Sequence, residues 1–157
     1  MEMPKPSPGH QRLQALVGRW EGEETMHPSQ WDPAGGVAVG RTSSRLALNG
    51  LVVITNYEQE RDGAITFAGH GVWHFDADKE VYILHWFDFF GQGPEVFTGV
   101  FEDEVLTASH AGPGTHMRLT YDLSEAGHLR SSMEMSKDGS SWTRMFDGHY
   151  ERLESTG

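Results

Sequence analysis

Three charged residues, Glu24, Asp88 and Arg144, alternate with large aromatic side chains along extended segments. A guanidinium can hold a carboxylate or another anionic group through paired hydrogen bonds. Two carboxylates in one apolar space can act as general acid and base when burial raises the pKa of one of them. An unpaired buried charge is costly, so an inward Arg144 needs Asp88, Glu24 or an anionic ligand as its partner. An internal ion pair and a ligand site therefore both fit these residues.

Short alternating segments joined by tight turns are the elements that must position these side chains. Two-residue hairpins are predicted at Asn49-Gly50, Glu102-Asp103 and Asp138-Gly139, and a further tight turn near Asp78-Lys79. Hairpins join neighbouring antiparallel strands, so the chain is predicted to be all-β, a single up-and-down antiparallel barrel of about ten strands. The predicted strands cover residues 19–27, 38–48, 51–60, 65–76, 81–88, 96–101, 104–110, 116–123, 129–137 and 140–153.

A short N-terminal helix is predicted over about 8–17, before the first strand. Ser7 can cap it and Pro8 suits its first position. Leu13 and Leu16 lie on its apolar stripe, which could close one end of the barrel.

The predicted hairpins fix which side chains share a face, because a two-residue turn sets the register of its strands. Around Asn49-Gly50, Leu48 and Tyr57 fall on the inward face. Around Asp138-Gly139, Met133 lies opposite Arg144, and both point inward with Trp142.

The turn near Asp78-Lys79 places Gly71 opposite Trp86 and Gly69 opposite Asp88, so a glycine leaves room for the indole ring. Burial of Trp20 in the first strand carries Glu24 inward as well. An apolar cavity with a few polar groups is the usual form of a small-molecule site. The predicted ligand-binding residues are Trp20, Glu24, Tyr57, Phe67, Trp73, Trp86, Asp88, Met133, Trp142 and Arg144.

The totals of the chain restrict the classes of function. A length of 157 residues suits one domain, 1–157, with residues 1–7 flexible and the barrel over about 18–153. The formal net charge of -11 argues against nucleic acid and anionic membrane surfaces as partners. The absence of cysteine excludes disulfides and thiolate chemistry. The start of the chain has no apolar signal core, so we expect a cytoplasmic protein.

Nine histidines raise the question of a metal. On a strand, His70 and His74 would be about 13 Å apart, too far for one ion. His128 and His149 are predicted to form an outward cross-strand pair. We predict surface histidines and no metal ligands.

The segment Leu16-Val17-Gly18-Arg19-Trp20-Glu21-Gly22 resembles the opening of lipocalin-like, calycin-type barrels. In an uncharacterised bacterial family, a domain of unknown function, a similar opening is followed by a Gly-rich strand and a Trp-x-Asp pair, here Trp86-Phe87-Asp88. The likeness extends over residues 10–153. It implies a ten-stranded barrel and no established activity.

The same opening is also similar to that of the nitrobindins, barrels that hold haem b through a histidine near the C-terminus. Their motif has a further glycine where this chain has Glu24, and His149 is the residue here that would match the haem ligand.

The leading hypothesis is non-enzymatic binding of a small apolar or amphipathic, possibly anionic, molecule in the barrel, with no cofactor. One alternative is a haem-binding nitrobindin relative that uses His149. Another is an enzyme that uses Glu24, Asp88 and Arg144 at the barrel mouth. An exposed edge or flat face could also support a homodimer.

Overall fold

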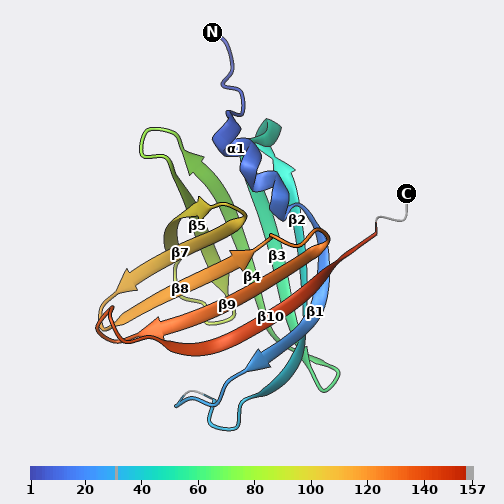
Figure 1. Cartoon of the computed structure of the whole chain (residues 1–157), viewed down its shortest axis with the longest axis vertical. Helices are drawn as coiled ribbons and strands as arrows, with labels where there is room; N and C mark the ends of the chain where they lie inside the picture. Colours follow the sequence, from blue (N-terminus) through green and yellow to red (C-terminus); the bar gives the residue numbers. More distant parts are fainter. Residues whose placement is uncertain (31, 155–157) are drawn as a thin grey trace.

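The computed structural model, which describes residues 1–30 and 32–154, is a closed antiparallel barrel of ten strands with a short N-terminal helix (Figure 1). Each strand pairs with its neighbours in sequence, and β1 closes the barrel against β10. This confirms the predicted all-β, lipocalin-like architecture. The strands are β1 (Gly18–Met26), β2 (Gly36–Ala47), β3 (Val52–Arg61), β4 (Ala64–Asp76), β5 (Val81–Asp88), β6 (Glu95–Glu102), β7 (Val105–Gly112), β8 (Thr115–Asp122), β9 (His128–Ser136) and β10 (Thr143–Leu153).

The N-terminal segment closes one end of the barrel. The helix α1 (Pro8–Arg12) continues into the 3-10 turn η1 (Leu13–Leu16), where Leu13 and Leu16 are buried in the core. The hydroxyl of Tyr82 donates to the carbonyl of Gly9 at 2.7 Å, and the indole of Trp20 donates to the carbonyl of Leu16 at 3.0 Å. The helix lies where the sequence predicts it, but its second half is tightened to 3-10 geometry. No helix among the described residues is long and apolar enough to cross a membrane.

The opposite end of the barrel, here called the mouth, is formed by the β1–β2 loop and the β3–β4, β5–β6, β7–β8 and β9–β10 connections (Figure 1). The buried core fills the half of the barrel next to the helix, with Trp73, Leu84 and Phe97 at its centre. Toward the mouth, inward-facing Trp86 and Met133 keep part of their surface accessible to solvent. Side chains therefore pack the closed end tightly and leave the mouth half of the interior, the lumen, reachable.

Two of the predicted registers are confirmed. In the β2–β3 hairpin Thr42 lies opposite Tyr57, and in the β4–β5 hairpin Gly71 lies opposite Trp86 and Gly69 opposite Asp88. Leu48 is an exception to the predicted faces. It leaves the ladder in the turn η2 (Leu48–Gly50) and is 71% exposed rather than inward.

The β6–β7 turn is displaced by one residue from the prediction. Glu102 pairs with Val105, so the turn residues are Asp103 and Glu104 rather than Glu102 and Asp103. The displacement changes the register by two positions and so leaves the faces as they were. Leu106 is fully buried on the inward face.

The predicted two-residue hairpin at Asp138-Gly139 is wrong. The connection spans 137–142, where the carboxylate of Asp138 accepts hydrogen bonds from the backbone of Ser140 and Ser141. The ladder begins one position later than predicted, with Arg144 opposite Glu134 on the outer face. A bulge between Arg144 and Phe146 then shifts the register by one more position, so Phe146 turns inward opposite Met133.

This change of register takes two predicted site residues out of the lumen. Arg144 lies on the outer face, where its guanidinium donates to Asp147 at 2.5 Å. Trp142 also lies outside, with the guanidinium of Arg118 4.2 Å from its ring centroid. The prediction that Arg144 and Trp142 point inward is therefore wrong.

Candidate ligand-binding site

A buried carboxylate forms the centre of the polar cluster, which consists of Glu24, Tyr57, Gln59 and Tyr150. Glu24 is 0% exposed, and the hydroxyl of Tyr57 donates to its carboxylate at 2.8 Å. The amide of Gln59 donates to the same carboxylate at 3.1 Å, and the Tyr150 hydroxyl also donates to it. Side chains from β3 and β10, which lie on either side of β1 in the barrel, thus donate to one carboxylate on β1.

Small residues beside β1 make room for this cluster. Glu24 lies opposite Ala38 on β2 and opposite Gly148 on β10. A Cβ at Gly40 would overlap the Glu24 carboxyl group. Trp20, on the same face of β1, is buried nearer the closed end. The alternation that buries this indole therefore also places the carboxylate inside, as the sequence predicts.

Burial raises the pKa of Glu24 above its ordinary value of 4.5. The hydrogen bonds from Tyr150, Tyr57 and Gln59 oppose that shift without cancelling it. Burial and the neighbouring carboxylate also raise the pKa of Tyr57 and of Tyr150. Both phenols therefore keep their protons at neutral pH and remain hydrogen-bond donors.

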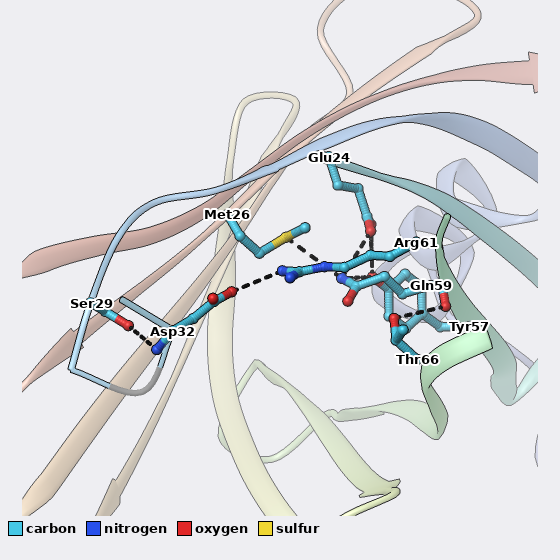
Figure 2. Close-up of polar contacts among 8 residues, drawn as sticks. All are labelled: Glu24, Met26, Ser29, Asp32, Tyr57, Gln59, Arg61 and Thr66. Atoms are coloured by element: carbon cyan, nitrogen blue, oxygen red, sulfur yellow. Dashed lines mark hydrogen bonds and ion pairs between the residues drawn. The ribbon is translucent and has the colours of Figure 1, made fainter. Parts of the chain in front are cut away.

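Arg61, which is not among the predicted site residues, extends across the mouth beside the polar cluster (Figure 2). Its guanidinium donates to Asp32 in the β1–β2 loop at 2.9 Å, and its charge acts on Glu24. Its Nε is buried and has no hydrogen-bond acceptor among the described residues. The alternation that places Tyr57 and Gln59 inward on β3 also reaches Arg61, which lies one residue beyond the predicted strand 51–60.

Aromatic rings continue from the polar cluster to the rim of the mouth. The ring of Tyr57 lies 6.4 Å from that of Trp86 and 6.2 Å from that of Phe67. Phe67 in turn contacts Phe89 and Phe90, which are 64% and 75% exposed. We call Phe67, Trp86, Phe89 and Phe90 the aromatic row. It gives the polar cluster an apolar approach from solvent.

Asp88 holds the end of the aromatic row in place. Its carboxylate accepts a hydrogen bond from the indole of Trp86 at 2.9 Å and another from the backbone of Phe90 at 2.9 Å. It therefore orients an aromatic wall, and the predicted pairing with Arg144 does not occur.

A cleft of about 650 Å³ opens at the mouth between the β1–β2 loop and the ends of β8, β9 and β10. Ser29, Thr115, Met135 and Met145 lie on its walls. A volume of this size is in the range of pockets that hold small organic molecules.

The predicted site residues divide into three groups. Trp20 and Trp73 are buried in the core near the closed end, with 2% and 3% of their surface exposed. Trp142 and Arg144 are outside the barrel. The residues that the structure brings together on the lumen side or at its rim are Glu24, Tyr57, Phe67, Trp86, Asp88 and Met133.

The histidine suggested as a haem ligand points away from the lumen. His149 pairs with Glu23 and Arg130 on the outer face, and its Nε2 lies 3.1 Å from Nδ1 of His128. A haem inside the barrel could not use this side chain, so the residues present do not fit the ligation that the nitrobindin resemblance implies. His110 is a histidine on an inward position, and its Nδ1 lies 2.9 Å from the Val96 carbonyl oxygen.

A family model described as "Protein of unknown function (DUF1579)" matches residues 5–152, nearly the whole chain. The chain belongs to this family. No curated protein matches the sequence. The DUF1579 assignment agrees with the domain of unknown function that the opening motif and Trp86-Phe87-Asp88 predict.

Solved structures share the barrel at low sequence identity. The crystal structure of Rv2717c from M. tuberculosis aligns with a TM-score of 0.72 and 14% identity over 94% of this chain and 99% of that chain. An S-type phycobiliprotein lyase, CPES from Guillardia theta, aligns with a TM-score of 0.66 and 9% identity over 96% of this chain and 100% of that chain. At these identities the likeness shows the shared fold.

Proposed function

We propose that this DUF1579 barrel binds a small amphipathic molecule at its mouth, without converting it. The apolar, ring-containing part of the ligand lies along the aromatic row, and its polar group accepts hydrogen bonds beside the polar cluster. The single observation that supports this most is the buried Nε of Arg61, which has no acceptor among the described residues and lies beside the polar cluster (Figure 2).

The unpaired N–H of Arg61 favours a ligand with a hydrogen-bond acceptor. A buried N–H without a partner costs about 1–3 kcal/mol, and a bound acceptor removes that cost. Gln59 adds an amide beside it, already donating to Glu24 and lying 3.2 Å from the Tyr57 hydroxyl. Arg61 therefore takes the role predicted for Arg144.

The proposal of binding without catalysis follows from what the polar groups already do. Glu24 is enclosed by its donors, Asp88 is occupied by the Trp86 indole, and Arg144 is outside. The three residues of the enzyme hypothesis therefore do not form one site.

Anilinonaphthalene sulfonate, an aromatic body with one anionic group, is a suitable probe. Isothermal titration calorimetry should show saturable binding to the folded protein. Trp86→Ala and Arg61→Met should each weaken the affinity about tenfold, which corresponds to about 1.4 kcal/mol. Circular dichroism of each variant should show the native barrel, because partly unfolded proteins also bind this dye.

The chain supplies matched controls on the outer face. Trp142→Ala and Arg144→Met remove the same side-chain types outside the barrel and should leave the affinity unchanged. Absence of saturable binding to the wild type, or equal losses from the outer-face variants, would contradict a site at the mouth.

A further inference from the structure

Two imidazoles and a carboxylate meet on the outer face, away from the lumen. His128 begins β9, His149 lies on β10, and Glu125 lies in the turn that precedes β9. Nδ1 of His128 and Nε2 of His149 are 3.1 Å apart. One potential ligand atom from each of the three residues lies within 4.8 Å of the other two.

The spacing of the two nitrogens suits a shared ion. Zn²⁺ binds imidazole nitrogen at about 2.0–2.1 Å in tetrahedral geometry, which places two ligand nitrogens about 3.3 Å apart. The Glu125 carboxylate lies 3.7 Å from Nε2 of His128, the ring nitrogen that does not face His149. Glu125 is exposed and lies in a turn, so rotation of its side chain can bring a carboxylate oxygen to the ion that the two imidazoles share. The third ligand is thus available without movement of the strands.

The surrounding charges favour a cation. Glu23 lies directly opposite His149 on β1, and Glu151 lies opposite His128 on β10. The opposing group is Arg130, whose guanidinium lies 3.6 Å from the Glu125 carboxylate and is 58% exposed. An exposed ion pair of this kind is worth about 0–1 kcal/mol, so a metal can displace it easily.

We propose that Glu125, His128 and His149 form a Zn²⁺ site on the outside of the barrel. Three protein ligands leave the fourth position of the ion to water or to a small external ligand. The ion would join the β8–β9 turn to β9 and β10, and so stabilise the folded barrel by binding it in preference to the unfolded chain. The site is independent of the proposed lumen ligand.

Calorimetric titration of the metal-free protein with Zn²⁺ tests the site. The wild type should bind one equivalent, His149→Ala should abolish this binding, and Glu125→Gln should weaken it about tenfold. Substitution with Co²⁺ should give the intense visible absorption of a four-coordinate ion, and thermal unfolding should shift upward on addition of Zn²⁺. Unfolding of each variant in a chelator should match the wild type, which shows that the variants fold.

A second pair of histidines provides the control. Nε2 of His74 and Nε2 of His85 are also 3.1 Å apart, but no third ligand residue completes such a group there among the described residues. His85→Ala should therefore keep the full Zn²⁺ affinity. The site would be refuted if the wild type bound no stoichiometric Zn²⁺, or if His85→Ala lost as much as His149→Ala. Dye binding at the lumen should be the same with and without Zn²⁺, so failure of either proposal leaves the other standing.

Discussion

Glu24 is an acidic residue in a fully buried position. A carboxyl group with no exposed surface is retained here because two phenols and an amide donate to it. Burial still raises its pKa, so the charged form is less favourable in the folded barrel than in the unfolded chain.

The raised pKa predicts a pH dependence of stability that Glu24→Gln should remove. The contribution of Glu24 is fully present below its unfolded pKa of about 4.5 and is lost as the pH rises through the higher folded value. The wild type should therefore lose free energy of unfolding, relative to the Gln variant, between pH 4 and neutral pH. Urea denaturation of both proteins at several pH values measures this difference, and a difference that does not change with pH would contradict the assignment.

At the scale of elements, the β4–β5 hairpin shows how a strand makes space for a side chain of the proposed site. Gly69 lies opposite Tyr57 on one side and Asp88 on the other. A Cβ at this position would overlap the six-membered ring of Trp86. The absence of a side chain at Gly69 thus leaves room for the indole ring of Trp86 beside the polar cluster.

Gly69→Ala should displace Trp86, destabilise the protein by about 1–3 kcal/mol through overpacking, and weaken dye binding. Denaturant unfolding and the dye titration measure the two effects. Gly93→Ala in the β5–β6 connection is the matched control, because a Cβ there meets nothing within 4 Å. Equal behaviour of the two variants would show that the position of Trp86 does not depend on Gly69.

The hairpins also show which strand registers could be predicted from the sequence and which could not. Asn49-Gly50 and Asp78-Lys79 predict the correct registers, since a short turn between alternating strands leaves few other pairings. Asp138-Gly139 misleads, because the Asp138 side chain organises a longer loop through hydrogen bonds to Ser140 and Ser141. The length of this loop depends on hydrogen bonds from the backbone to a side chain, and the dipeptide Asp138-Gly139 alone does not indicate them.

The wrong register at this hairpin explains why two predicted site residues lie on the outer face. A shift of one position reverses the faces, so Arg144 and Trp142 leave the lumen. The bulge after Arg144 lies on β10 and leaves the alternation of β9 unchanged, so the predicted inward position of Met133 holds. Arg61 is absent from the predicted site for a different reason: it lies one residue beyond the predicted strand 51–60, although it continues the alternation of Tyr57 and Gln59 along β3.

At the scale of the whole molecule, the barrel is closed at one end and accessible at the other. The helix α1 and the turn η1 seal the end where the core is densest, and the mouth carries the cleft, the aromatic row and Arg61. Under the proposed function, this polarity would give the ligand one route of entry and place its polar group toward the polar cluster. The outer face, with its histidines and Arg144, has no part in that route.

The most direct test of binding at the mouth is an NMR titration of the tryptophan indole N–H signals with anilinonaphthalene sulfonate, assigned by single Trp→Phe variants. The indole of Trp86 lines the proposed site and that of Trp142 lies outside. We predict that the Trp86 signal shifts and saturates while the Trp142 signal stays in place. A shift confined to Trp142, or no shift of Trp86 at saturating dye, would contradict the account.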